Sequence, residues 1–278
     1  MAEPQTTLVV VVADLHTNST IGLCTPSVDL DDGGTYTASK AQRDYLLRNW
    51  RRFWRDVVAL RDEVRAGRVV VVVNGDLVDD NRHSKAQLIT VNKSSIIALA
   101  ARVLEPAREI ADDLIVVRGT EAHSGQSGEL EELVAREVGA QPDPVTGQFS
   151  HWFLLAEIEG VLFDVAHHPP TSGRRPWTKA PAAARAGAIL RSQYLEEGVR
   201  VPDVAIRAHV HFYQPGPREP KPEFCYCPPW QLCTSFGHRI GAGGRIEPVG
   251  GLVYVCREGA YQFHALRYPP GKVKPWRV

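Results

Sequence analysis

The sequence Val9-Val10-Val11-Val12-Ala13-Asp14-Leu15-His16 is an apolar run that ends in an acid and a histidine, and several later apolar runs are also followed by acids or histidines. A short, continuous run of β-branched residues is typical of a strand that is buried on both of its faces. The run ends in an aspartate and a histidine two positions apart, and an extended chain places such a pair on the same side. A carboxylate oxygen and an imidazole nitrogen held together at a strand end make up half of a metal site.

Four later apolar runs end in the same kind of residue. They cover residues 69–73, 114–117, 161–166 and 204–207, and acids or histidines follow each of them. The carboxyl ends of neighbouring parallel strands meet at one edge of a sheet, where open α/β folds bind their ligands. We therefore expect the following side chains to converge: Asp14, His16, Asp76, Glu121, His123, His167, His209 and His211.

The rest of the chain predicts an α/β fold that forms one domain over residues 1–278, since we find no internal repeat and no linker. Apolar residues at helical spacing predict helices at 39–66, 84–104, 129–138 and 181–197, the second ending before Pro106. The first helix carries an aromatic stripe that includes Trp50, Phe53 and Trp54. Such a stripe packs in a core or stacks on nucleic-acid bases, and we favour the core.

The remaining strands are predicted from alternation and turn residues. We expect a hairpin with arms 151–158 and 161–166, and further strands near Leu232 and over 252–266. The polar segment 17–37 is predicted to be a loop that forms a lid or a wall of the site.

The composition is that of an ordinary globular protein, with 44% hydrophobic and 23% charged residues among 278 and a formal net charge of zero. No overall field attracts the chain to nucleic acid or membrane, and no apolar run approaches the roughly 20 residues that span a bilayer. We expect no signal peptide and a cytoplasmic location, which the odd number of cysteines favours. Cys225, Cys227 and Cys233 are interpreted as buried thiols, with a structural metal site as the alternative.

Mixed aspartate and histidine ligands suit divalent ions such as Mn, Fe, Zn or Ni. The chain offers more of these ligands than one ion needs, which favours two ions that share a carboxylate. Two ions about 4 Å apart clamp a phosphoryl group and lower the pKa of a bridging water.

The order D-x-H, G-D-x-x-D, a turn like G-N-H, a lone histidine and G-H-x-H resembles the calcineurin-like metallophosphoesterase family. The match runs from Asp14 to His211, and some of its features resemble phage members and the branch of double-strand-break repair nucleases. The resemblance implies a four-layer αββα sandwich of two mixed β-sheets with helices on both outer faces. It also implies hydrolysis of a phosphate ester by in-line attack of a metal-bridging hydroxide.

The same resemblance implies a role for each matching residue. A first ion, with Mn the leading candidate for both ions, would be held by Asp14, His16 and His211. Asp76 would bridge to a second ion held by His167 and His209, while His168 would support the site or face the substrate. Asp79 corresponds to the last acid of G-D-x-x-D, which is more often a supporting residue than a ligand.

The chain departs from the family pattern at two positions. Ala208 replaces the glycine of G-H-x-H, which is a small change. In Gly119-Thr120-Glu121-Ala122-His123 the usual asparagine ligand is absent, and we expect Glu121 to replace it, with Thr120 as the alternative. His123 would then be the catalytic acid, unless the altered turn takes it out of reach and weakens the second site.

The segment after His167 is expected to lie over the site and to contact the substrate. Arg174 and Arg175 suit phosphate oxygens and Trp177 suits a base, which favours a phosphodiester in a nucleotide or in DNA. The alternatives are solvated arginines with a packed tryptophan, a phosphomonoesterase, or a metal-binding module without catalysis. His83 could face the site, although a surface position is the simpler interpretation.

Overall fold

A computed structural model describes residues 5–81, 87–173, 175–234 and 247–271 of the chain. It has a mixed α/β fold, in which the first strand, β1 (Thr7–Val12), is buried along its whole length. The side chains of β1 alternate between two cores: Leu8, Val10 and Val12 belong to one, and Val9 and Val11 to the other. This alternation explains why the run is apolar at every position.

β1 lies in a six-stranded mixed sheet with the order β13-β12-β1-β4-β5-β6. Strands β1, β4, β5 and β6 are parallel, and the hairpin β12–β13 pairs with β1 in the antiparallel direction. The bounds are β4 (Arg68–Asn74), β5 (Asp113–Val117), β6 (Ser150–His151), β12 (Val249–Arg257) and β13 (Ala260–Tyr268).

A second mixed sheet has the order β10-β11-β9-β8-β7. Strands β8, β9 and β11 are parallel to one another, whereas β7 and β10 are antiparallel to their neighbours. The bounds are β7 (Leu154–Ile158), β8 (Val161–Val165), β9 (Val204–Arg207), β10 (Gln214–Pro215) and β11 (Glu223–Tyr226).

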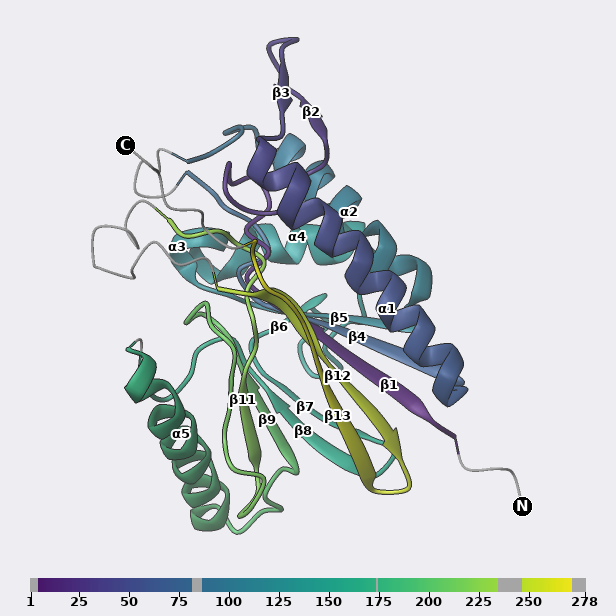
Figure 1. Ribbon diagram of the computed structural model, residues 1–278, viewed down its shortest axis with the longest axis vertical. Coiled ribbons are helices and arrows are strands. Elements are labelled where there is room, and N and C mark those ends of the chain that lie inside the picture. The colour runs from purple at the N-terminus through teal and green to yellow at the C-terminus, as the bar shows by residue number, and fades with distance from the viewer. Residues whose placement is uncertain (1–4, 82–86, 174, 235–246, 272–278) are drawn as a thin grey trace.

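The helices lie on the outer sides of the two sheets (Figure 1). Helices α1 (Arg48–Val64), α2 (Lys93–Ile110) and α4 (Glu129–Glu137) pack on the six-stranded sheet, and α5 (Pro176–Glu196) packs on the other. A separate apolar cluster, with residues from both sheets, fills the space between them. In the described ranges no helix is long and apolar enough to cross a bilayer.

The aromatic stripe of the first predicted helix is confirmed as core. A six-residue π-helical segment, η1 (Gln42–Leu47), precedes α1, so that helical structure extends through most of the predicted range. Trp50, Phe53 and Trp54 are buried and pack edge-on or stacked against one another, and Trp50 also contacts Trp230. These rings are therefore unavailable for stacking on bases.

The second predicted helix is wrong at both ends. Residues 84–86 of its range lie outside the described residues, and α2 begins only after Asn92. The side chain of Asn92 accepts a hydrogen bond from Ser95 N at 3.1 Å. The helix also continues through Pro106 to Ile110. Proline removes one helical hydrogen bond, but Val103 and Ala107 on either side are buried in the core, and this packing holds the helix together.

Other predicted elements differ in their bounds. The predicted arm 151–158 is two strands, β6 in one sheet and β7 in the other, so the chain crosses between sheets at residues 152–153. The predicted strand 252–266 is the hairpin β12–β13, which turns at Gly259 with φ of 76°. Leu232 lies in an irregular segment, where its N–H donates to Ile21 O at 2.9 Å.

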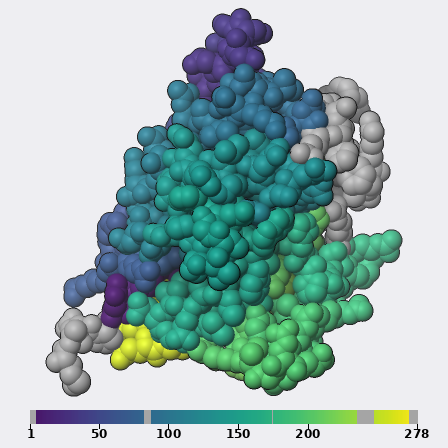
Figure 2. Space-filling model, turned by 180° about the vertical axis from the view of Figure 1, so that it is seen from behind, coloured from purple at the N-terminus to yellow at the C-terminus, as the bar shows by residue number. Residues whose placement is uncertain are grey.

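Two segments contain more regular structure than the sequence predicts. Within residues 17–37 the short strands β2 (Ser27–Asp29) and β3 (Thr35–Thr37) form a hairpin that projects from the body, at the top of Figure 2. Helix α5 begins at Pro176 and not at residue 181, so Pro181 lies inside the helix. Trp177 and Lys179 therefore lie on the first turns of a helix.

Candidate metal centre

The strand ends identified in the sequence meet at one place. Asp14 and His16 follow β1, Asp76 follows β4, and their backbones are joined by hydrogen bonds from Asp14 N to Gly75 O (3.1 Å) and from His16 N to Asp76 O (2.9 Å). The second sheet joins this edge through His167, whose Nδ1 lies 2.8 Å from Asn74 O. The carboxyl ends of strands in both sheets therefore border a single site.

Five of the predicted ligands have a left-handed backbone, which is uncommon for residues other than glycine. Their φ angles are 53° for Asp14, 44° for His16, 49° for Asp76, 68° for His209 and 56° for His211. Such conformations cost free energy, so the surrounding structure must hold them in place. Strain concentrated on the same few residues is typical of a functional site.

Two glycines permit the close approach of the loops that carry these residues. A Cβ atom on Gly75, which has φ of 76°, would lie 2.3 Å from the imidazole of His167. A Cβ atom on Gly119 would lie 2.1 Å from Asp76 N. No larger side chain fits at either position, so the glycines of G-D-x-x-D and of the 119–123 turn are required by packing.

One group of ligand-type atoms is formed by Asp14, His16, Asp76 and His211, all within 4.8 Å of one another. His211 Nε2 lies 3.2 Å from Asp14 Oδ1 and 3.2 Å from His16 Nε2. His16 Nε2 lies 3.9 Å from Asp76 Oδ2. Asp14, His16 and His211 are the residues expected around a first ion, and Asp76 is the carboxylate expected to bridge to a second.

A second group is formed by His167, His168 and His209, whose nitrogens also lie within 4.8 Å of one another. Asp76 Oδ2 lies 3.0 Å from His167 Nε2 and 4.0 Å from His209 Nδ1, so this carboxylate borders both groups. The structure thus brings the six residues expected as His and Asp ligands together around Asp76: Asp14, His16, Asp76, His167, His209 and His211.

Several polar atoms in the site suit a bound cation. Both carboxylate oxygens of Asp14, together with His16 Nδ1 and His167 Nε2, are buried and make no hydrogen bond of good geometry to the residues that the structure describes. Their near neighbours are other ligand-type atoms, with His211 Nε2 3.2 Å from Asp14 Oδ1 and Asp76 Oδ2 3.0 Å from His167 Nε2. Buried polar atoms are rarely left in this state, because each costs about 1–3 kcal/mol. The clusters of buried aspartate and histidine could therefore hold a metal ion, and their ligand types fit one.

Glu121 does not join this cluster. It is exposed at the start of the one-turn helix α3 (Glu121–Ser124), and among the residues described it belongs to none of the ligand groups. Thr120 is the residue that faces Asp76, with its Oγ1 3.2 Å from Asp76 Oδ2. The expectation for Glu121 must be corrected, because a helix that begins at residue 121 turns successive side chains apart.

The altered turn keeps His123 within reach of the site. Its Nδ1 is hydrogen-bonded to Asp79 Oδ1, and its Nε2 lies 3.8 Å from Asp76 Oδ2. The other oxygen of Asp79 lies 3.4 Å from His16 Nδ1, so that Asp79 lies between two imidazoles. The side chain of His123 is 25% exposed, whereas that of His16 is fully buried, so only the former is accessible from solvent.

The charges of the site act on the pKa of each group. Burial works to raise the pKa of Asp76, but the imidazoles of His167, His123 and His16 outweigh it and hold that pKa well below the usual range. Burial lowers the pKa of His167, but the carboxylates of Asp76 and Asp14 outweigh it and raise the pKa to about 10. Burial and the neighbouring His167 lower the pKa of His209 to about 4.

Glu131 is a site residue that the sequence did not reveal. It lies in α4 and is fully buried, and it accepts hydrogen bonds from Leu77 N at 3.0 Å and from Gly119 N at 2.7 Å. It thus holds the two loops that carry Asp76 and Thr120. The only signal in the sequence is a glutamate one position from Leu130 on the apolar face of a helix, which is too weak to identify it.

Two of the residues expected to contact substrate, Arg175 and Trp177, lie at the start of α5. Arg174 and His83 lie outside the described residues. Trp177 is 70% exposed and does not pack on the body, and the guanidinium of Arg175 lies 5.7 Å from its ring centroid. Lys179 Nζ lies 4.4 Å from the ring centroid of Phe212, the residue after His211, which ties the start of α5 to the site.

The cysteines lie apart from the ligand groups. Cys225 and Cys227 are buried in the cluster between the sheets, where burial raises the pKa of both thiols well above the usual range. A metal would need them as thiolates. Cys233 is partly buried, and throughout the described ranges no cysteine belongs to a group of metal-ligand type.

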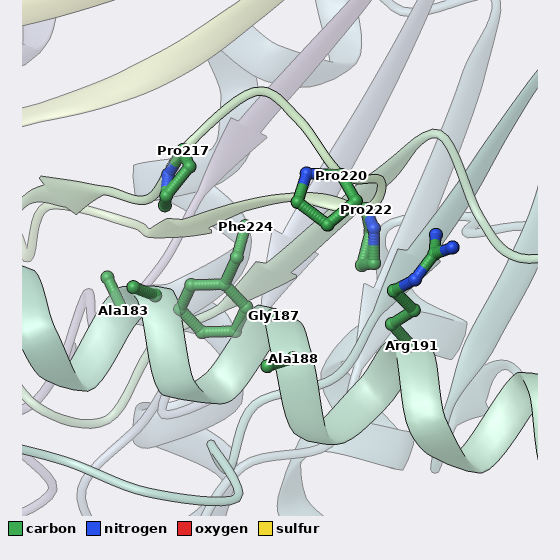
Figure 3. Close-up of a pocket in the computed structure, with 9 residues that line it drawn as sticks. Ala183, Gly187, Ala188, Arg191, Pro217, Pro220, Pro222 and Phe224 are labelled. Atoms are coloured by element: carbon green, nitrogen blue, oxygen red, sulfur yellow. The ribbon is translucent and has the colours of Figure 1, made fainter.

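Two hollows lie away from this site. A cavity of about 110 Å³ lies between α5 and the proline-rich segment before β11, with Gly187 and Arg191 on one side and Pro217 and Pro220 on the other (Figure 3). A larger hollow of about 630 Å³ borders α5 and the second sheet. Neither is lined by any residue of the two ligand groups.

Comparison of the chain with family models and with curated proteins finds no match.

Proposed function

We propose that this chain is a dinuclear metal-dependent phosphoesterase of the calcineurin-like type, which hydrolyses phosphodiester bonds. The observation that carries the proposal is the position of Asp76 between two groups of ligand-type side chains, Asp14, His16 and His211 on one side and the histidines at 167, 168 and 209 on the other. The pairing of His123 with Asp79 next to these groups adds a source of protons.

The arrangement of the cores supports the proposed type of fold. One cluster joins helices to the six-stranded sheet, a second lies between the sheets, and a third joins α5 to the five-stranded sheet. This succession is the one expected of the four-layer αββα sandwich in that family. We propose this architecture for the single domain formed by residues 1–278.

The proposed site would bind two divalent ions with Asp76 as the shared ligand. Asp14, His16 and His211 would hold one ion, and His167 and His209 the other. When bound, such ions polarise the phosphoryl group and supply a nucleophilic water at neutral pH. Mn is the ion that we would supply first, with Fe, Zn and Ni as further candidates.

In this proposal His123 protonates the leaving oxygen. Its Nδ1 is occupied by Asp79, which leaves Nε2 to face the substrate. Burial works to raise the pKa of Asp79, but the neighbouring His16 and His123 outweigh it and keep the carboxylate ionised. An ionised Asp79 stabilises the protonated imidazole and fixes the direction of its ring, which a general acid requires.

A diester of a nucleotide or of DNA is the proposed substrate class. The exposed ring of Trp177 and the guanidinium of Arg175 form a flat, cationic surface at the start of α5. Such a surface suits the stacking of a base beside a phosphate. A phosphomonoesterase is the second candidate, because the same metal ligands serve both reactions.

The experiment is to load the purified chain with Mn and measure its turnover of bis-p-nitrophenyl phosphate and p-nitrophenyl phosphate. Metal analysis of the same sample should give about two ions per chain. Higher kcat/KM on the diester supports the proposal, and higher kcat/KM on the monoester supports the second candidate. Two bound ions without turnover of either ester would indicate a metal-binding module and contradict an enzyme.

A further inference from the structure

The group of ligand-type atoms around His167 is larger than the resemblance implies. His168, the next residue, has its ring centroid 4.9 Å from that of His167 and 4.8 Å from that of His209. The side chain of His168 therefore lies beside those of His167 and His209, although the side chains of consecutive residues usually point in different directions. The turn Pro169-Pro170 follows directly and restricts the backbone at this point.

We infer that His168 is a direct ligand of the second ion, so that three imidazoles from His167, His168 and His209 hold this ion together with Asp76. The inference rests on the proposed function. His168 would then take the place of the asparagine that the turn at 119–123 lacks. Glu121 would not be the replacement, and His168 would bind the ion instead of facing the substrate.

The spacing of the donor atoms supports this assignment. Thr120 Oγ1 lies 3.2 Å from His168 Nε2, 3.1 Å from His209 Nδ1 and 3.2 Å from Asp76 Oδ2. Neighbouring ligands of one ion, each bonded at about 2.1 Å, are themselves separated by roughly 3.0–3.4 Å. The donors of His168, His209 and Asp76 therefore surround the hydroxyl of Thr120. Asp76 Oδ2 lies 3.0 Å from His167 Nε2 and 4.0 Å from His209 Nδ1, and the nitrogens of the three histidines lie within 4.8 Å of one another, which is close enough for all four residues to bind a single ion.

The same contacts argue against Glu121 as the ligand. Glu121 is exposed at the first turn of α3, while the hydroxyl of Thr120 occupies the direction toward Asp76. A neutral hydroxyl is a weak ligand for a divalent ion, so Thr120 alone would leave the second ion poorly held. The imidazole of His168 removes this deficit without any change in the turn.

The inference has a consequence for the metal. The first group contains two carboxylates, Asp14 and Asp76, with two imidazoles, whereas the second would contain three imidazoles and only the shared carboxylate. Carboxylates suit Mn, and imidazoles suit Zn, Fe and Ni. The second ion is therefore expected to show a stronger preference for Zn over Mn than the first.

The test is a titration of the metal-free protein with Zn and, separately, with Mn, in competition with a chelator of known affinity. Wild type, His168→Ala and Glu121→Gln are compared, and Glu121→Gln serves as the matched control because it changes the other candidate ligand. We expect two ions in wild type and in Glu121→Gln. In His168→Ala the first ion should remain and the affinity for the second should fall by about 100-fold.

Thermal denaturation of the metal-free variants checks that they are folded. Their melting temperatures should match that of wild type, because His168 is exposed. Loss of the second ion in Glu121→Gln but not in His168→Ala would overturn the inference while leaving the proposed function intact. A wild-type chain that binds no second ion would overturn both. A wild-type chain that binds two ions but prefers Mn over Zn at both sites would also contradict the inference.

Discussion

Gly119 N donates a hydrogen bond of 2.7 Å to Oε2 of Glu131, so a carboxylate from helix α4 holds the loop beside Asp76. The other oxygen of Glu131 accepts from Leu77 N at 3.0 Å. Thr120 N, the next donor along the chain, is directed to Asp76 Oδ1 at 2.6 Å. The position of the proposed bridging carboxylate therefore depends on a buried glutamate that is not itself a member of either group of ligand-type atoms.

We expect Glu131→Gln to destabilise the protein by about 1–3 kcal/mol, because the amide nitrogen replaces one of two buried acceptors and leaves a backbone N–H unpaired. Urea denaturation of the metal-free protein measures this change. Glu137→Gln, an exposed position on the same helix, is the control and should differ from wild type by less than about 0.5 kcal/mol. Equal stability of the two variants would show that the Glu131 bonds are unimportant.

Gly119→Ala should destabilise the protein by about 1–3 kcal/mol, because the added Cβ would overlap the backbone next to it. This atom would lie 2.1 Å from Asp76 N, so the loop that carries the proposed bridge must shift. Chemical denaturation and metal stoichiometry measure the two effects together. Gly67→Ala, where a Cβ meets nothing within 4 Å, is the matched control. The packing argument fails if both variants behave alike.

His123→Ala should lower kcat on a dinucleotide by about 10²–10⁴-fold, because its alcohol leaving group must be protonated. The loss should be much smaller with bis-p-nitrophenyl phosphate, whose leaving group is stable as an anion. Metal analysis should give wild-type content, since another seven residues form the two proposed ligand groups and Asp76 stays in place. Equal losses on both substrates would contradict the role of His123 as a proton donor.

The metal-free protein should lose stability as the pH rises from about 7 to about 10. The carboxylates of Asp76 and Asp14 overcome burial and raise the pKa of His167 to about 10 from its usual 6.5. A raised pKa stabilises the fold fully below the unfolded value, and this contribution is lost as the pH passes the folded value. Denaturation of EDTA-treated protein at several pH values measures the trend.

The control for this pH dependence is His167→Gln, which lacks the titrating group. Other groups that titrate at high pH contribute equally to both proteins, so the difference between the two curves isolates His167. The difference in the free energy of unfolding between wild type and His167→Gln should become smaller as the pH rises. Parallel curves for wild type and His167→Gln would refute the raised pKa.

Trp177→Ala should lower kcat/KM on a dinucleotide by about tenfold, because base–aromatic stacking contributes about 1–3 kcal/mol. Turnover of bis-p-nitrophenyl phosphate should change far less, since the reacting groups are untouched. Trp152→Ala, at another exposed tryptophan with 60% of its surface accessible, is the control. A dinucleotide rate that Trp177→Ala leaves unchanged would remove the support for nucleotide recognition at α5.

The sequence was most informative about the strands and the residues that follow them. A continuous apolar run such as 69–73 has few alternatives to a buried strand, and β4 contains all of it. The carboxyl ends of neighbouring parallel strands meet at one edge of a sheet, so Asp14 and Asp76, which follow β1 and β4, could be grouped from sequence alone. His209 follows β9 in the other sheet, so its place near Asp76 depends on how the two sheets pack. Helix bounds were less certain, because burial of residues such as Val103 outweighed the local signal of Pro106.

By itself, the sequence determined which side chains of ligand type lie at the strand ends, because this depends on local patterns of apolar and polar residues. The tertiary structure decided which of them share a site: Thr120 faces Asp76 while Glu121 is exposed, and His168 lies beside His209. The direction of a loop side chain depends on backbone angles such as the left-handed φ of Asp76. Those angles are imposed by packing between two sheets and by Glu131, which is distant in the chain from β4, and no local pattern encodes them.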